Sequence, residues 1–243
     1  YFDPRGHKRP FNAVAVIRLV STPLYPEDTI TVTLGDISGG SRGLAVQSFP
    51  ENACDFAVFL DPLSSGEYKR VYCQSSNFTI LSGPSEYFTV VAPTIVEVGK
   101  PFRVQVRGND KFGNPTPVDK TGLTLDADPA INVVLSQSDG RATWVDGVIL
   151  NATGVRRLEL KDGEKILAIS NPIVAQTKVD EIICWGDTQA QTASTVGVGT
   201  PDEYFAYARD LAAIDFTTHQ GNDFILSDGD LEEVGLAAKK YNE

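Results

Sequence analysis

A long series of short apolar segments, bounded by glycine, proline and serine, constrains the fold of this chain more than any other feature. The series begins near Thr29 and continues to about residue 175. Its first segments read TITVTL, GLAVQSF, CDFAVFLD, YKRVYC, NFTIL and EYFTVVA, with the alternation and β-branched content of strands. The intervening SGGSRG, PLSSGE and SGPSE supply turn residues. The sequence therefore predicts a mainly β chain.

Two β domains are predicted within this series. Residues 1–92 are expected to form an N-terminal all-β domain with a sandwich region, and residues 93–176 an immunoglobulin-like β-sandwich of about seven strands. In the segment FRVQVR, Val104 would face the core and Gln105 the solvent, as in a half-solvated antiparallel strand. Trp144 is expected to fill the core of the second domain.

The charge of the chain excludes some partners. The net charge is −11 over 243 residues, and residues 176–243 hold 13 acidic against 4 basic side chains. Such an acidic surface repels phosphate backbones and anionic lipids, so we expect neither nucleic-acid nor membrane binding. A solvated surface explains this excess, and so would a cation site inside it. No uninterrupted run of 18 apolar residues occurs, so we predict a soluble chain.

The three cysteines leave the compartment open. Cys54, Cys73 and Cys184 cannot all pair internally. Cys54 and Cys73 could pair across neighbouring strands, but we favour buried thiols in a reducing cytoplasm, because free cysteine is among the most buried residue types. The chain opens on Tyr1 rather than Met, so we expect a piece of a longer protein.

One loop of the second domain could hold calcium. Asp110, Asn114 and Asp119 cluster in NDKFGNPTPVD, and hard cations take clustered loop oxygens. The Gly-Asn and Asn-Pro pairs are also ordinary turn chemistry, and the spacing matches no EF-hand. We favour the turn.

The pattern changes after residue 176 to strand, helix, strand, helix. Residues 182–185 predict a buried strand, and residues 214–218 a second one. Between them, Thr200 and Glu203 form a capping box around Pro201, which is typical of a helix start. Ser227 begins a second helix towards Tyr241. Because βα units cross over right-handed, the two strands should lie parallel.

Polar side chains follow both predicted strands of this tail. In α/β sheets the loops after the carboxyl ends of strands hold the functional site, so these side chains should lie together. They are Asp187, Gln189 and Gln191 after the first strand, and His219, Gln220, Asn222 and Asp223 after the second. Each also has a plain structural explanation: a hydrogen-bonded His219, Asp187 capping a turn, and Asn222 in a left-handed loop.

Three segments of the tail resemble a known superfamily. WGDTQAQT, GTPDEYFAYARDLAAIDF and THQGNDFILSD are similar to motifs of the polymerase-and-histidinol-phosphatase (PHP) superfamily, and to a mostly uncharacterised bacterial family within it that has a β-rich leader. The resemblance implies a seven-stranded β/α barrel whose strand ends bind divalent ions, commonly Zn, Mn or Fe, which activate a water to attack a phosphoester. Residues 177–243 would be the first, incomplete βαβα segment of this barrel.

The resemblance also implies which residues form the site. It places metal ligands at Asp187, Gln189, Gln191, His219 and Asp223, and substrate contacts at Gln220 and Asn222. Gln189 and Gln191 stand where the superfamily has histidine, and a following acidic residue is replaced within residues 196–199. Carboxamides bind transition ions less well than imidazoles and would weaken activation of a bound water.

Two functions are therefore expected for the whole protein. The first is a metal-dependent phosphoesterase-like hydrolase, with the β domains as scaffold or substrate-access module. The second is a catalytically degenerate relative that serves as a binding or structural module. In either case the remainder of the barrel must come from other residues or another chain, because two parallel strands leave their edges uncovered. A homo-oligomer is one such arrangement.

Overall fold

The structure, a computed structural model, is mainly β and divides into two compact units, Tyr1–Ser48 and Phe49–Glu243. This division differs from the predicted boundary at residue 92, which lies inside the second unit. The residues that the structure describes are 2–3, 14–71, 77–118, 120–127, 130–133, 141–222 and 224–242.

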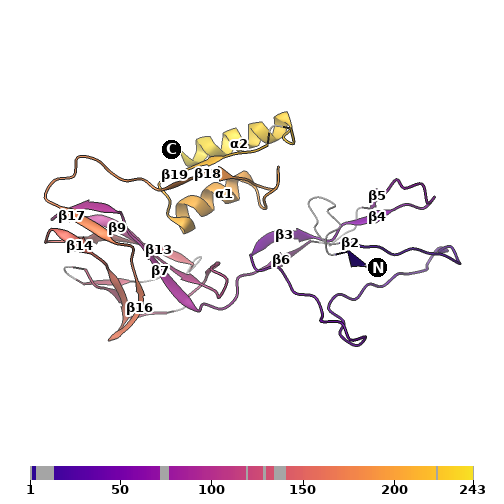
Figure 1. Cartoon of the computed structure of the whole chain (residues 1–243), viewed down its shortest axis with the longest axis horizontal. Helices are drawn as coiled ribbons and strands as arrows, with labels where there is room; N and C mark the ends of the chain where they lie inside the picture. Colours follow the sequence, from indigo (N-terminus) through magenta and orange to yellow (C-terminus); the bar gives the residue numbers. More distant parts are fainter. Residues whose placement is uncertain are drawn as a thin grey trace. The chain divides into compact units, whose positions relative to one another are not determined.

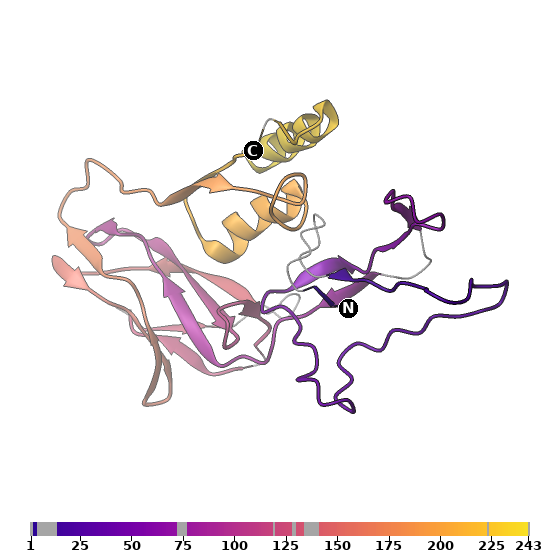
Figure 2. The ribbon, with the colours of Figure 1, turned by 45° about the vertical axis from the view of Figure 1, so that its right-hand side comes forward.

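The first unit contains little regular structure in its described residues. β1 (Phe2–Asp3) pairs with β2 (Val14–Ala15) in an antiparallel ladder. Residues 16–48, in indigo in Figure 2, are extended or turned without a further strand. The predicted strands at residues 29–34 and 43–49 are therefore wrong. Their β-branched side chains favour extended backbone, but a strand also needs a partner to pack against and pair with.

Four short strands open the second unit. β3 (Glu51–Asp55) pairs with β6 (Asn77–Ile80), and β4 (Val58–Leu60) with β5 (Lys69–Val71), all antiparallel. The predicted segments YKRVYC and NFTIL contain β5 and β6, whereas CDFAVFLD, predicted as one strand, is divided between the end of β3 and β4. In the described residues these strands form separate two-stranded ladders rather than a sandwich. Cys54 on β3 is a half-buried free thiol, and Cys73 lies outside the described residues.

Three sheets with one hydrophobic core follow, and we call residues 87–176 the core domain. The first sheet holds β7 (Tyr87–Val91), β9 (Phe102–Asn109), β10 (Pro115–Thr116) and β13 (Ala142–Val148). The second holds β11 (Leu123–Leu125), β12 (Ile131–Val133), β15 (Glu159–Asp162) and β16 (Lys165–Ile169). The third holds β8 (Ile95–Glu97), β14 (Gly154–Arg156) and β17 (Ile173–Gln176). One hydrophobic core joins the three sheets, and its fully buried residues include Val104, Leu123, Leu160 and Ile173.

The alternation predicted for β9 is correct for one face only. Val104 and Val106 are fully buried, as expected. Gln105 is fully buried too, because its face is covered by the helical segment near residue 210 rather than by solvent. Trp144 does not fill the core either: it is half-buried on β13, with the guanidinium of Arg103 3.7 Å from its ring centroid.

The tail has the predicted order of strand, helix, strand, helix. β18 (Gly186–Ala190) and β19 (Phe216–His219) are parallel, as predicted, and run side by side near α1 and α2 in Figure 1. The first strand begins at Gly186, so the prediction of a buried strand at residues 182–185 is wrong. Ile182 and Trp185 are exposed there, because the partner strand reaches only as far as Gly186.

Both helices of the tail begin at the predicted caps. α1 (Pro201–Tyr207) continues into a π-helical turn, η1 (Ala208–Ala212), and α2 spans Asp228–Tyr241. Each begins with a complete capping box, Thr200 with Glu203 and Ser227 with Asp230. The rings of Phe205 and Tyr241 stack with centroids 6.0 Å apart and join the helices. In the described part of the chain, no helix has the length and apolar content needed to cross a membrane.

Candidate functional site

The carboxyl ends of β18 and β19 lie next to each other and form the candidate site. Ala190 pairs with His219, and the next residue, Gln220, donates its backbone N–H to the Ala190 carbonyl at 2.8 Å. At the start of the pair, Gly186 lies so close to β19 that a Cβ there would overlap the carbonyl oxygen of Phe216. The parallel pairing thus brings the segments after residues 190 and 219 together.

A β-bulge changes which side chains face the site. Asp187 pairs with Thr217, whereas Ala190 pairs with His219, so three steps on β18 match two steps on β19. A bulge of this kind re-aims the side chains that follow it. Buried Ala190, rather than Gln189, therefore lies beside His219. The simple alternation predicted for Asp187, Gln189 and Gln191 does not hold.

His219 is half-buried and already has a partner. Its Nε2 atom shares a hydrogen bond of 3.0 Å with Oγ1 of Thr192, which is fully buried. Burial lowers the pKa of His219, which favours the neutral imidazole. Gly221 lies close to this ring and to Leu226: a Cβ at residue 221 would overlap Cδ1 of Leu226 and lie 3.3 Å from Cε1 of His219. The ring is held by the protein, as in the plain structural explanation.

Gln191 belongs to a second hydrogen-bonded group beside His219. Its Oε1 atom accepts a hydrogen bond of 2.8 Å from Oγ1 of Thr195, and Nδ2 of Asn222 lies 3.5 Å from the same oxygen. The loop is closed by its own backbone, because the Thr192 carbonyl accepts from the N–H groups of Thr195 at 3.0 Å and Gly197 at 2.9 Å. We call Gln191, Thr192, Thr195, His219 and Asn222 the strand-end network.

The other expected site residues lie outside this network. Asp187 and Gln189 are exposed on β18, where the Gln189 N–H donates to Oδ1 of Asp187 at 2.9 Å. The predicted turn-capping role of Asp187 resembles this contact. Gln220 is exposed, and Asp223 lies outside the described residues.

Several hydroxyl groups near the site were not found from the sequence. Thr217 on β19 donates from Oγ1 to the Asp187 carbonyl at 3.0 Å and also contacts the hydroxyl of Tyr204 on α1. Burial raises the pKa of Tyr204. The only sequence signal for Thr192 and Thr195 was a threonine-rich run directly after the strand, a position where hydroxyls bond to nearby polar groups.

The chemistry of these donors suits a transition metal poorly. Gln189 and Gln191 offer carboxamides, which bind transition ions less well than imidazoles do, and Gln191 directs its oxygen to protein donors. Over the described residues, which leave out Asp223, no three or more His, Cys, Asp and Glu side chains gather closely enough to hold a metal ion. The exposed oxygens of Asp187 and Gln189 would suit harder cations.

The loop considered for calcium is instead closed around one carboxylate. Asp110 accepts hydrogen bonds from Phe112 N at 2.8 Å, Gly83 N at 2.9 Å, Asn114 N at 3.0 Å and Asn114 Nδ2 at 2.8 Å. Desolvation raises the pKa of Asp110, but these hydrogen bonds outweigh it and lower the pKa to about 2. Both carboxylate oxygens of Asp110 accept hydrogen bonds from the protein. Asp119 lies outside the described residues.

Comparison with known proteins finds distant relatives. The chain is 22% identical over 201 residues to an uncharacterised protein of Chlamydia trachomatis, covering 78% of this chain and 32% of that protein. It is 22% identical over 232 residues to an uncharacterised protein of Chlamydia muridarum, covering 89% of this chain and 36% of that protein. The chain thus spans about a third of the length of the curated relatives it matches.

No family model matches the chain. Among solved structures, it is similar to domains 4 and 5 of the S-layer protein SbsC, with 20% identity and a TM-score of 0.26. That match covers 50% of this chain and 65% of the other.

Proposed function

We propose that this chain is the leading part of a protein with a PHP-like barrel that has lost transition-metal hydrolysis and serves as a binding or structural module. The strand-end network supports this proposal. Gln191 and His219, at positions where the resemblance expects metal ligands, contact Thr195 and Thr192 instead.

The energetics of the network favour this reading. An ion that bound Nε2 of His219 would compete with the hydrogen bond to Thr192, and an ion that bound Oε1 of Gln191 would compete with the contacts of Thr195 and Asn222. Breaking hydrogen bonds of buried groups costs about 1–3 kcal/mol each when the partner is left unsatisfied. A bond from the metal to a carboxamide would offset this cost less than a bond to an imidazole, because transition ions bind imidazole nitrogen more strongly.

The proposal includes the finer architecture. Residues 93–176 would be an immunoglobulin-like sandwich, and residues 177–243 the first βαβα segment of the barrel. The parallel pairing of β18 and β19 across an intervening helix supports the second assignment. Exposed Phe216 and Leu236 would then be covered by the remaining barrel, supplied by residues outside this chain or by another chain, a second copy included.

Hydrolysis in the whole protein is the second candidate. Asp187 and Gln189 present exposed oxygens from one strand near the meeting point of two strand ends, and such oxygens suit a harder ion such as Mn²⁺. In this case Asp187, Gln189, Gln191, His219 and Asp223 would hold the ion, and Asn222 and Gln220 would contact the substrate.

Restoring histidine to the site tests the proposal. The full-length protein, a Gln189→His/Gln191→His variant and a Gln176→His/Lys178→His control would be purified and their Zn, Mn and Fe content measured. The control adds the same histidine spacing at exposed positions near the end of β17. We expect stoichiometric metal only in the Gln189→His/Gln191→His variant.

Two outcomes would contradict parts of the proposal. If the wild-type protein holds stoichiometric metal and hydrolyses p-nitrophenyl phosphate, and His219→Ala abolishes both, the hydrolase candidate is correct. If the Gln189→His/Gln191→His variant gains no more metal than the control, the assignment of a PHP-like site to these strands is wrong.

A further inference from the structure

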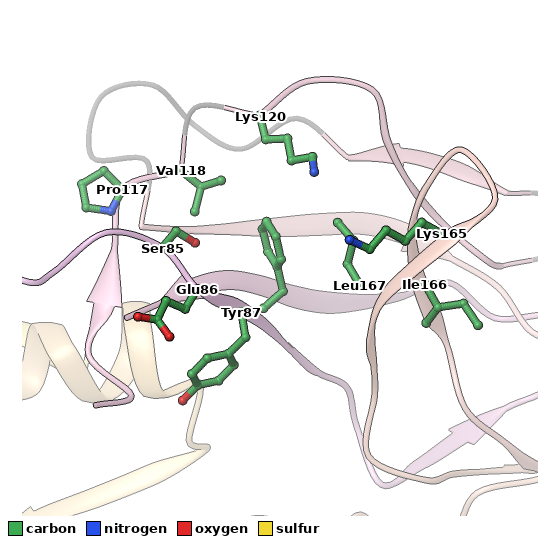
Figure 3. Close-up of a pocket in the computed structure, with 10 residues that line it drawn as sticks. Ser85, Glu86, Tyr87, Pro117, Val118, Lys120, Lys165, Ile166 and Leu167 are labelled. Atoms are coloured by element: carbon green, nitrogen blue, oxygen red, sulfur yellow. The ribbon is translucent and has the colours of Figure 1, made fainter. Parts of the chain in front are cut away.

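A hollow in the core domain lies between edge strands of two sheets. β7 and β16 are at the edges of their sheets in the described residues, and the hollow is lined by residues 85–88, residues 165–167, Pro117, Val118 and Lys120. Figure 3 shows these residues around it. Its volume is about 470 Å³, within the range of about 300–1,000 Å³ typical of small-molecule sites.

Part of the lining of this hollow is apolar and packs against the core of the domain. Phe88, Val118 and Leu167 line it and pack against the hydrophobic core of the domain. Val118 can approach because residue 108 is glycine: a Cβ there would overlap the Val118 side chain. An apolar ligand body would therefore meet a preformed surface, with little cost for ordering side chains.

Two lysines give one side of the hollow a positive charge. In Figure 3 the ammonium groups of Lys120 and Lys165 lie on the same side, away from the carboxylate of Glu86. Lys120 forms a half-exposed ion pair with Asp162 at 2.7 Å. Lys165 forms no ion pair with any residue that the structure describes, so its charge is available to a ligand.

We propose that this hollow binds a small amphipathic carboxylate. The apolar body would lie on Phe88 and Leu167, and the carboxylate would pair with Lys165 and approach Lys120. An amphipathic carboxylate can contact both the apolar residues and the lysines. A neutral compound would lack the ion pair, and an inorganic anion would lack the apolar contact. The site lies in the core domain and does not rest on the function proposed for the strand ends.

Calorimetric titration of the 243-residue chain with 4-phenylbutyrate tests this proposal. We expect 1:1 binding, and about two- to fivefold weaker binding of the neutral 4-phenylbutanamide, since an ion pair with an exposed lysine contributes roughly that factor. Lys165→Gln should weaken binding of the carboxylate by about two- to fivefold as well. Affinity should fall as salt is added, because the lysines are partly exposed.

Lys111→Gln is the matched control. The Nζ atom of Lys111 lies 4.8 Å from the ring centroid of Phe112, but this pair lines no part of the hollow. We expect Lys111→Gln to bind 4-phenylbutyrate with the affinity of the wild type. All variants should show unchanged circular dichroism.

Three results would overturn the proposal. They are the absence of saturable binding of 4-phenylbutyrate, equal affinity for the amide, and equal loss of affinity in both lysine variants. In the first case, increased self-association of Lys165→Gln would show that Lys165 protects an edge strand from pairing with other chains, as lysines on edge strands do.

Discussion

The side chain of Gln105 donates a hydrogen bond of 2.7 Å from Nε2 to the backbone carbonyl of Asp210. Its neighbour on the same face of β9, Arg107, donates from Nη1 to the carbonyl of Leu211. Both carbonyls lie in the last turn of η1, where a helix leaves acceptors without internal partners. The core domain therefore caps the helical segment that connects β18 and β19.

Removing this cap should weaken the attachment of the tail. Gln105→Ala takes away a donor and a fully buried side chain, so we expect a loss of about 1–3 kcal/mol in the free energy of unfolding. Urea unfolding followed by tryptophan fluorescence measures it, because Nε1 of Trp185 donates to Oγ1 of Thr94 across the same attachment. Gln176→Ala, at an exposed position, should change the free energy by less than about 0.5 kcal/mol. An equal effect of both variants would contradict the cap.

Close approach of the two tail strands should make Gly186 irreplaceable. In Gly186→Ala the new methyl group would overlap the carbonyl oxygen of Phe216 and push the strands apart, so we expect a loss of more than about 2 kcal/mol in unfolding free energy.

Gly235→Ala is the control for that variant. Gly235 lies in α2 with open space around its Cβ position, so alanine should stabilise the helix by roughly 0.5–1 kcal/mol. Thermal unfolding of both variants would show opposite shifts. A Gly186→Ala variant as stable as the wild type would mean that the strands pair differently in solution.

The features predicted correctly from the sequence are mostly local. The capping boxes of α1 and α2 involve residues three positions apart, and the segment FRVQVR contains the residues that make β9 a strand. Parallel pairing of β18 and β19 was predicted because the handedness of βα units is nearly invariant.

The features that were missed depend on distant partners. Gln105 is buried because of residues 105 positions later in the chain. Ile182 and Trp185 resemble a buried strand, yet β19 pairs only from Gly186 onward. The bulge between Asp187 and Ala190 has no glycine or other marker in the sequence, so the facing of Gln189 could not be predicted.

Acid should destabilise the turn around Asp110. Its pKa of about 2 lies below the usual 3.8, so its stabilising contribution is complete above about pH 4 and is lost as the pH falls from there towards 2. Asp110→Asn should be destabilised at pH 6. The new side-chain NH₂ is a donor, and it would face the backbone N–H of Phe112 or Gly83, which is also a donor. The difference in unfolding free energy between Asp110→Asn and the wild type should shrink near pH 2.

Urea unfolding at several pH values between 2 and 6 measures this dependence. Asp146→Asn, which changes an exposed carboxylate on β13, should retain the wild-type slope. If Asp110→Asn shows the same acid dependence as wild type, other carboxylates determine it.

In the isolated chain, the tail should be cut by protease more readily than the core domain. Trp185 is 63% exposed and Phe224 82% exposed, and two parallel strands form too small a sheet to be stable alone. Brief chymotrypsin digestion should cut beyond residue 177 while leaving the core domain intact. The same bonds should be protected in the full-length protein, where we expect the remaining barrel to cover them. A tail that resists digestion in the isolated chain would count against an incomplete barrel.

Thr192 distinguishes a structural role of His219 from a ligand role. Thr192→Val keeps the shape of the side chain but removes the hydroxyl 3.0 Å from Nε2 of His219, in a fully buried position. If the contact is structural, unfolding free energy should fall by about 1–2 kcal/mol, as for other buried hydrogen bonds, with metal content unchanged. Thr218→Val, exposed on the same strand as His219, should have little effect on either quantity. A Thr192→Val protein that keeps its stability and gains metal would mean that Thr192 competes with an ion for His219, which would support a ligand role for His219.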